Sequence, residues 1–344
     1  MTRLQMQSGN QIKSRPSVAL LVIIGGLFVL GFAVVLSVSV GAVDIEWRTV
    51  WTAIFQYDPS LSQHRIIMDL RLPRTLGSVM VGVGFAVAGA VMQGMTRNPL
   101  ADSGLLGLNA GAAFVLAICF AFFPELSFIY LILYCFVGAG IGAGLVFGIG
   151  SMSRGGLTPV RLTLAGAAVS ALLTALSEGI GLLFHLQQSL AFWYAGGVAG
   201  TTWSQLGLMA PWVIAGLIAA IILSRSVTLL SLGSEVATGL GQRTRLVQTL
   251  GMLVVLVLAG SAVSAVGSVA FVGLIIPHVA RFLVGRDYRW IIPCSAVLGA
   301  LLMVLADTAA RTINPPYETP VGALIALIGV PFFLYLARKQ RGEL

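Results

Sequence analysis

The chain alternates between long apolar runs and short polar connections, and this alternation most constrains its fold. A helix needs roughly 20 consecutive apolar residues to cross the hydrocarbon core of a bilayer. Runs of about that length lie at about 17–40, 74–95, 104–123, 127–150, 160–184, 204–224, 246–266, 269–284, 290–310 and 320–337. Only 9% of the 344 residues are charged, whereas a soluble domain carries about 25%. The sequence therefore predicts an all-α integral membrane protein with ten transmembrane helices and excludes a soluble enzyme.

The polar segments predict one membrane domain with short tails. We expect a cytoplasmic tail at 1–16, a ten-helix domain at 17–337 and a second cytoplasmic tail at 338–344. The longest polar stretches within the domain lie at about 41–73 and 225–245. The apolar run at 17–40 is longer than the 7–15-residue core of a secretory signal peptide. We therefore interpret it as the first spanning helix rather than a cleaved leader.

The distribution of basic residues predicts the orientation. Ten spans put both termini on one side, and with that side inside, fifteen of the twenty Lys and Arg residues face the cytoplasm. Cytoplasmic loops of membrane proteins carry the excess of Lys and Arg, so both termini are predicted to be cytoplasmic. Five basic residues fall outside against this bias: Arg48, Arg65, Arg71, Arg74 and Arg311.

Motifs for covalent chemistry are absent from the sequence. It contains no G-x-x-x-x-G-K-[ST] phosphate loop and no G-x-S-x-G nucleophile elbow. The three histidines are scattered, and the three cysteines lie in apolar stretches without the spacing of a metal site. We expect a chain that is not an enzyme, holds no cofactor or metal, and does not itself hydrolyse a nucleotide.

Two outer arginines, Arg71 and Arg74, flank a proline at the predicted start of the second span. A helix N-terminus is already partly positive, so cations there require an anionic neighbour. That neighbour is a lipid headgroup, the nearby Asp69, or the carboxylates of a partner protein, which guanidinium groups bind in a bidentate manner. The residues alone leave these three possibilities open.

Two carboxylates, Glu178 and Asp307, fall inside predicted spans, both toward the outer end. The simplest interpretation of each is a partly hydrated group near the interface that bonds a neighbouring helix. Asp307 and Arg311 are four residues apart, a spacing that places both on one helix face. We therefore predict a local ion pair between them.

Two inner connections carry further signals. The segment 98–104 predicts a proline-containing turn in which Asp102 or Ser103 caps the third span, and the glycines of 104–111 predict close helix packing. The segment 232–246 is long for an inner connection and amphipathic at its start. It is either a solvated loop or a short helix offered to a cytoplasmic partner.

Together these segments resemble a known family. The relevant motifs are RLPR (71–74), GAVMQG (89–94), NPLAD (98–102), GLLG (104–107), FVGLIIPHVAR (271–281), the pair 306–307 with Arg311, ETPVG (318–322) and GVPFF (329–333). In this order they resemble the FecCD-type permease subunits of type II ABC importers, which take up iron(III)-siderophores, haem and vitamin B12. The resemblance covers about residues 65–340.

The resemblance implies a type II ABC importer permease fold and a set of partners. These are a second permease subunit, identical or homologous, two cytoplasmic ATP-binding subunits and an extracytoplasmic substrate-binding protein. ATP and Mg are bound by the ATPase subunits and not by this chain. The implied location is the bacterial cytoplasmic (inner) membrane, and no nucleic acid is involved.

The resemblance also assigns roles to residues at matching positions. Arg71, Arg74 and Arg311 match outer arginines that meet glutamates of the binding protein. Asn98 and Leu100 match residues near the cytoplasmic gate, and Thr158 is the one hydroxyl kept in a second gate segment that is Ser/Thr-rich in relatives. Coupling to the ATPases is assigned to residues of the 232–242 segment: Glu235, Ala237, Gly239, Leu240 and Gly241.

The resemblance predicts translocation of an iron(III)-siderophore complex across the cytoplasmic membrane, driven by ATP on partner subunits. Haem or vitamin B12 are alternative cargoes for the same class of importer. A stand-alone secondary transporter is the rival interpretation from another class, and it would need no ATPase.

Overall fold

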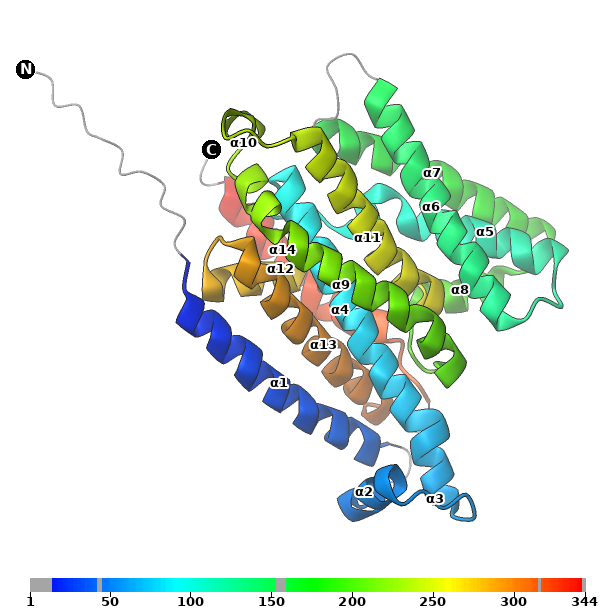
Figure 1. Ribbon diagram of the computed structural model, residues 1–344. Helices are drawn as coiled ribbons and strands as arrows, with labels where there is room; N and C mark the ends of the chain where they lie inside the picture. Colours follow the sequence, from blue (N-terminus) through cyan, green and yellow to red (C-terminus); the bar gives the residue numbers. More distant parts are fainter. Residues whose placement is uncertain (1–13, 42–44, 153–158, 315–316, 342–344) are drawn as a thin grey trace, which may run out of the picture.

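The computed structural model describes residues 14–41, 45–152, 159–314 and 317–341, and it contains no β-strand within these ranges. Ten helices of 13 residues or more make up the described bundle (Figure 1): α1 (Pro16–Ser39), α4 (Leu72–Thr96), α5 (Leu108–Phe122), α6 (Phe128–Met152), α7 (Pro159–Leu183), α9 (Trp203–Ser231), α11 (Thr244–Val266), α12 (Val272–Val284), α13 (Tyr288–Thr312) and α14 (Val321–Arg341). Each matches one predicted span. The all-α membrane fold is thereby confirmed.

Seven of these helices are both long and apolar enough to cross a membrane, and α5, α12 and α14 are shorter apolar helices. The shortness of α12 agrees with the sequence, where Pro277 interrupts the run at 269–284. The chain before it has no regular secondary structure from 267 to 270, and Phe271 has a left-handed backbone with φ of 69°. Irregular backbone at membrane depth is tolerated where protein buries it or where it lines a cavity.

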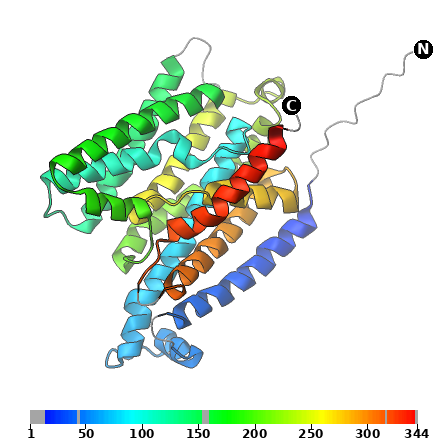
Figure 2. The same cartoon turned by 180° about the vertical axis from the view of Figure 1, so that it is seen from behind.

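The two ends of the bundle differ in what they contain. Helix α1 begins and α14 ends at the same end, which we call the terminal end (Figures 1 and 2). We call the opposite end, where α1 ends and α4 begins, the arginine end, because Arg71, Arg74 and Arg311 lie there. The sequence predicts that the terminal end is cytoplasmic.

Four short helices lie in the connections: α2 (Trp47–Phe55), α3 (Ser62–Arg65), α8 (Gln187–Ala195) and α10 (Ser234–Gly239). The stretch 41–73 had been expected only as a polar connection, yet it holds α2, α3 and a π-helical stretch at Ile66–Arg71. This stretch joins α3 to α4, so one helix of 35 residues runs over Ser62–Thr96. Sequence patterns missed these turns because amphipathic helices outside the bilayer lack a long apolar run.

Two predicted connections are more helical than expected. Helix α9 continues to Ser231 and α11 begins at Thr244, which shortens the predicted connection at 225–245, and α14 continues to Arg341 through part of the predicted tail at 338–344. Within the shortened connection α10 confirms the short-helix interpretation of the segment 232–246. Helices that project from a membrane keep their backbone bonds in water, so the end of an apolar run does not mark the end of the helix.

Helix α4 lies at the centre of the bundle and is buried over most of its length, with α13, α11, α9 and α12 packed around it. Gly82 of α4 meets the backbone of Gly299 in α13, and Gly89 meets Gly273 in α12, with no room for a Cβ at either crossing. Small residues allow helices to approach this closely in lipid. By contrast, α1 is at the periphery and exposes most of its apolar side chains.

The predicted packing face at 104–111 is confirmed. Gly111 in α5 lies against the carbonyl of Gly138 in α6, and Gly107 lies against Gly142. Asp102 does cap a helical turn, by accepting a bond from the Ser103 N–H, but that turn is the 3₁₀ turn Ser103–Leu106. Helix α5 itself starts later, after Gly107 with φ of 70°.

Candidate functional site: an arginine cluster and an inner coupling surface

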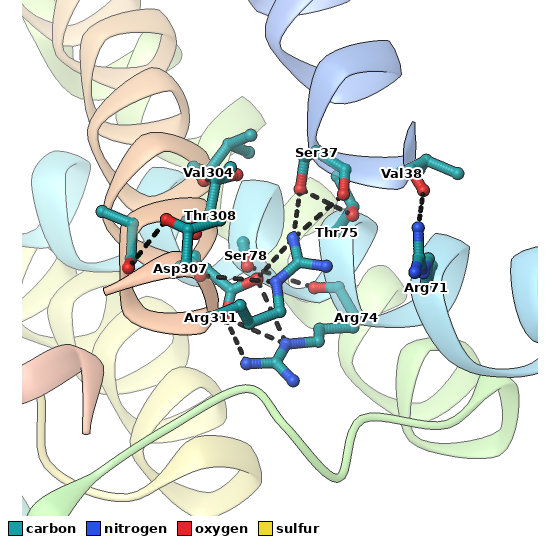
Figure 3. Close-up of polar contacts among 12 residues, drawn as sticks. Ser37, Val38, Arg71, Arg74, Thr75, Ser78, Val304, Asp307, Thr308 and Arg311 are labelled. Atoms are coloured by element: carbon teal, nitrogen blue, oxygen red, sulfur yellow. Dashed lines mark hydrogen bonds and ion pairs between the residues drawn. The ribbon is translucent and has the colours of Figure 1, made fainter. Parts of the chain in front are cut away.

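The three outer arginines assigned to docking lie together at the arginine end, each in contact with other parts of the chain (Figure 3). Arg74 Nε donates to both oxygens of Asp307, at 3.0 and 3.2 Å, and its Nη2 lies 2.9 Å from Oδ1. Its Nη1 reaches Glu318 Oε1 at 2.5 Å. One guanidinium therefore joins α4, α13 and the segment before α14.

Arg311 binds the other side of the same carboxylate. Its Nη2 lies 3.3 Å from Asp307 Oδ2, one turn away on α13, which confirms the predicted ion pair. The same nitrogen donates to Oγ of Ser37 at 2.6 Å and to its backbone oxygen at 3.1 Å. Ser37 Oγ also lies 3.1 Å from Thr75 Oγ1. These contacts connect α1, α4 and α13.

Arg71 hydrogen-bonds the C-terminal end of α1. Its Nη1 donates to the carbonyl oxygens of Val38 and Ser39, at 2.8 and 2.9 Å. The last carbonyls of a helix have no partner within the helix, so a guanidinium placed there satisfies them. Gly41 lies against the same guanidinium, which fills the space a Cβ would need.

Burial divides the acids of this cluster into two kinds. The side chain of Asp307 is 0% exposed, whereas that of Glu318 is 50% exposed. Asp307 lies between two guanidinium groups, so its charge is fully paired. Glu318 contacts Arg74 from the solvent side, where a competing carboxylate could replace it.

The structure revises the reasoning that singled out these arginines. Because the helix runs on to Ser62, Arg71 and Arg74 are not at a helix N-terminus. The acid that pairs with Arg74 is Asp307 and not Asp69, and Asp307 is fully buried instead of partly hydrated. Glu178, the other intramembrane acid, is exposed in the described chain, and its predicted bond to a neighbouring helix stays a prediction. The sequence marks Glu318 only as part of the ETPVG motif, because its 244-residue separation from Arg74 gives no local signal of the pair.

The remaining outer arginines behave differently. Arg48 and Arg65 are exposed, on α2 and α3, whereas Arg71 and Arg74 are buried. The side chain of Arg311 is 8% exposed, so the three arginines assigned by resemblance are the ones with buried side chains. The sequence could not make this distinction, because all five residues carry the same charge and are predicted on the same side of the membrane.

At the terminal end, the predicted gate residues lie in the turn that follows α4. Asn98 Oδ1 accepts the N–H of Leu100 at 2.9 Å, and Asn98 O accepts that of Ala101 at 3.1 Å, which is the predicted turn. Asn98 and Leu100 are half-buried. Thr158, the third predicted gate residue, lies outside the described residues.

This turn leads back into the bundle and reaches the start of α12. Asp102 Oδ1 approaches Gly273 so closely that a Cβ at 273 would lie 2.6 Å from it. Burial of this carboxyl raises its pKa above the ordinary aspartate value, and hydrogen bonds from Ser103 partly oppose that shift. The gate turn and the first turn of α12 are therefore in direct contact.

Sequence analysis missed a buried polar connection between α4 and α12. Pro277 has no N–H, so the carbonyl of Gly273, four residues earlier, loses its usual helical donor. Gln93 of α4 supplies one: its Nε2 lies 3.2 Å from Gly273 O and 3.3 Å from Leu274 O. Its Oε1 accepts from Arg281 Nη2 at 2.9 Å. A proline inside an apolar helix, read together with a buried glutamine, is the signal that could have indicated this pairing.

The predicted coupling residues form a small surface on α10 and the turn after it. Ala237 is fully buried and anchors the helix, while Glu235, Gly239, Leu240 and Gly241 are exposed. Gln242 Nε2 donates to Ser226 O at 2.9 Å and holds the turn against α9. Gly241 has φ of 82°, a conformation that favours glycine.

This surface is apolar as well as charged. Val236 on α10 and the flanking Leu232 and Leu240 are all exposed, although Gly233, with φ of 131°, separates Leu232 from the helix. Exposed apolar residues on and beside a short helix suit a helix that docks into a groove of a partner. Across the described residues, no three His, Cys, Asp or Glu side chains come together as a metal site.

Comparison with known proteins gives consistent matches. The FecCD transport family matches residues 27–339. The iron(3+)-hydroxamate import system permease protein FhuB of Bacillus subtilis (strain 168) is 57% identical over 331 residues, which cover 96% of this chain and 86% of that protein. The hemin transport system permease protein HmuU of Yersinia pestis is 34% identical over 330 residues, covering 91% and 96%.

A solved structure of an inward-facing metal-chelate type ABC transporter has the same fold. It superposes with a TM-score of 0.82 at 30% sequence identity and covers 94% of this chain and 100% of that chain. The type II ABC importer permease fold is thereby confirmed over nearly the whole chain.

Proposed function

This chain belongs to the FecCD transport family, and we propose on that premise that it is the membrane-spanning permease subunit of an ABC importer for iron(III)-siderophore complexes. One observation carries the choice of cargo: 57% identity over 96% of the chain to a permease named for iron(3+)-hydroxamate import. The 34% identity to a hemin permease supports haem less strongly. The chain performs no covalent chemistry in this role.

The partners follow from the family to which the chain belongs. Two cytoplasmic subunits bind and hydrolyse ATP, and the sequence of this chain has no phosphate-binding loop of its own. A second permease, identical or homologous, completes the membrane pathway, and an extracytoplasmic binding protein delivers the complex. The excess of Lys and Arg at the terminal end supports a cytoplasmic location for both termini.

The docking site for the binding protein is the arginine end. Arg71, Arg74 and Arg311 are already paired within the chain, so a partner carboxylate has to compete for them. Glu318 is the exchangeable acid, because it is half exposed while Asp307 is buried. On docking, a carboxylate of the binding protein therefore replaces Glu318 on Arg74. Arg71 and Arg311 keep their bonds within the chain and hold α1 and α13 in place during this exchange.

The coupling site is the α10 surface at the opposite end. ATP binding and hydrolysis on the partner subunits move α10, which Gln242 fixes to α9. Arg97, the last residue before the gate turn, lies beside Gly233 at the start of α10. Movement of α10 is therefore transmitted directly, through Arg97, to the turn that carries Asn98 and Leu100.

The direct test is uptake by a reconstituted importer. The permease is assembled in proteoliposomes with its ATPase and binding protein, and ⁵⁵Fe-labelled ferric hydroxamate, labelled haem and labelled vitamin B12 are offered in separate experiments. We expect ATP-dependent accumulation of the ferric hydroxamate and much lower accumulation of the other two.

Each alternative has its own outcome in this experiment. Faster uptake of haem or vitamin B12 would reassign the cargo and keep the importer. Transport by the permease alone, driven by an ion gradient without ATPase, would select the secondary transporter and overturn the proposal.

A further inference from the structure

Helix α2 (Trp47–Phe55) is an outer element with three distinct faces. At 100° per residue, Val50 and Ala53 fall on one face, and both are buried against Val38, Ile45 and Ile67. A second face carries Trp47, Trp51, Ile54 and Phe55, and the third carries Arg48 and Thr52, which are exposed. The helix therefore has a protein face, an aromatic face and a polar face.

The aromatic face is not covered by the described part of the chain. Trp47, Trp51 and Phe55 are 67%, 61% and 65% exposed, and Ile54 is also exposed. The rings of Trp51 and Phe55 are 4.5 Å apart, and the Arg48 guanidinium lies 5.6 Å from the Trp47 ring. Full exposure of such a group to water is unfavourable, so the face requires an occupant.

The position of α2 along the bundle indicates which occupant fits. The Ser62–Thr96 helix has 35 residues and is thus about 52 Å long, more than the ~40–45 Å of a whole bilayer. Arg71 lies at the end of α1, whose 24 residues already span about 36 Å, so the turns that precede Arg71 extend beyond the hydrocarbon core. Arg71 binds the last carbonyls of α1, and α2 packs on Ile67, about 6 Å further out. The headgroup layer occupies about this depth on each side.

The face is also continuous with a lipid-facing surface. Helix α1 has its exposed apolar residues, including Phe28 and Phe32, along the outside of the bundle, and α2 lies just beyond its end (Figure 1). Trp and Tyr concentrate at membrane interfaces, because their rings are apolar with one polar group. An amphipathic helix with aromatic residues on one face and Arg on another is typical of a helix lying in the interface.

We propose that α2 is an interfacial anchor whose aromatic face inserts into the lipid headgroup layer at the arginine end. The Arg48 side chain points to the phosphates, and Val50 and Ala53 hold the helix on the protein. The anchor fixes the depth of the end of α1 and therefore of the Arg71 and Arg74 pairs beside it.

A protein partner fits this face less well. The three aromatic side chains are about two-thirds exposed, so they supply at most about 300–500 Å², and Ile54, which is 40% exposed, adds little. A stable interface needs about 800 Å² from each partner. Lipid has no such minimum, because each inserted side chain contributes on its own.

Depth measurement by spin labelling tests the proposal. A nitroxide is attached at Trp51→Cys in the full importer, in bilayers of phosphatidylethanolamine and phosphatidylglycerol, and its collisions with oxygen and with a water-soluble nickel chelate are measured. The matched control is Thr52→Cys on the polar face, and Ser60→Cys in the exposed turn is the water reference. The described natural cysteines are all buried, and wild-type protein gives their background.

We expect the label at 51 to collide several-fold more with oxygen and several-fold less with nickel than the label at 60, with 52 in between. A label at 51 as accessible to nickel as that at 60 would overturn the proposal. Shielding at 51 that appears only after the binding protein is added would also overturn it and make the face a protein contact. If Trp51→Cys does not fold, Phe55→Cys on the same face replaces it.

Discussion

The two ends of the molecule treat their charged residues in opposite ways. At the arginine end, three guanidinium groups and Asp307 are buried and bonded to one another or to backbone carbonyls. At the terminal end, α10 exposes Glu235 and Val236, and the flanking Leu232 and Leu240 are exposed as well. Both ends are proposed to bind partner proteins. Only at the arginine end are the charged side chains already paired with groups of the same chain.

This difference teaches that location near a partner does not determine what a residue contributes to stability. A buried ion pair becomes very costly when one member is removed, because a charge remains without compensation. An exposed charge contributes little to folding. Mutations at the arginine end should therefore reduce both folding and function, whereas mutations on α10 should reduce function alone.

The largest expected effect is at Arg74. Arg74→Ala removes the closest contacts of the buried Asp307 and leaves it Arg311 at 3.3 Å, so we expect a loss of about 3 kcal/mol in the free energy of unfolding, the lower end of the range for breaking a buried ion pair. Thermal unfolding of the purified protein in detergent measures it. Arg65→Ala, at the same end but exposed, is the control and should change stability by less than about 0.5 kcal/mol. Equal melting temperatures for the two variants would remove the distinction between buried and exposed arginines.

This expectation also bears on docking experiments. Charge reversal at Arg71, Arg74 and Arg311 together would remove uptake, but the buried pairs predict that the protein would also fail to fold. A docking test therefore needs a variant that keeps these pairs, and Glu318 provides it.

The second largest loss of stability is expected between the two ends, where Gln93 of α4 contacts α12. Gln93→Met removes the donor that replaces the missing N–H of Pro277, and we expect a loss of about 1–3 kcal/mol from the unsatisfied carbonyl of Gly273. Adding Pro277→Ala restores a backbone N–H, so the double variant should regain part of the lost stability. Pro277→Ala alone is the control, and a double variant no more stable than Gln93→Met would contradict the proposed role of Gln93.

A smaller effect is expected at Glu318. Glu318→Gln removes a half-exposed charge from Arg74 and should cost no more than about 1 kcal/mol. Because the partner carboxylate then meets less competition, the binding protein should bind more tightly, as measured by surface plasmon resonance on permease in nanodiscs. Glu125→Gln, an exposed acid after α5, is the matched control. Weaker binding by Glu318→Gln would show that Glu318 supports docking instead of competing with it.

The smallest effect on stability is expected at Glu235. Glu235→Lys changes an exposed residue and should alter the free energy of unfolding by less than about 0.5 kcal/mol. Stimulation of ATPase activity by the loaded binding protein should nevertheless be lost, because the altered side chain faces the ATPase. Glu125→Lys makes the same charge change at the other end. Normal stimulation in Glu235→Lys would count against the coupling role of α10.

Sequence patterns were most informative where a single helix decides the outcome. The ten apolar runs, the Asp307–Arg311 pair and the short helix at 232–246 all depend on residues close in the chain, and all three appear in the structure. Patterns were least informative for helices outside the bilayer, such as α2, and for bonds between distant helices. The Gln93–Gly273 bond joins residues 180 apart, and no local periodicity indicates it.

The sequence by itself indicated an all-α membrane protein and predicted ten spans, because the length of an apolar run must match the thickness of the hydrocarbon core. Its motifs indicated which family it resembles. The basic residues added a predicted orientation. Only the tertiary structure decided which charges are exposed. Arg74 and Asp307 are 233 residues apart, and they meet because Gly82 and Gly299 let α4 and α13 approach closely. Burial then makes the pairing obligatory, since neither charge has water as an alternative partner.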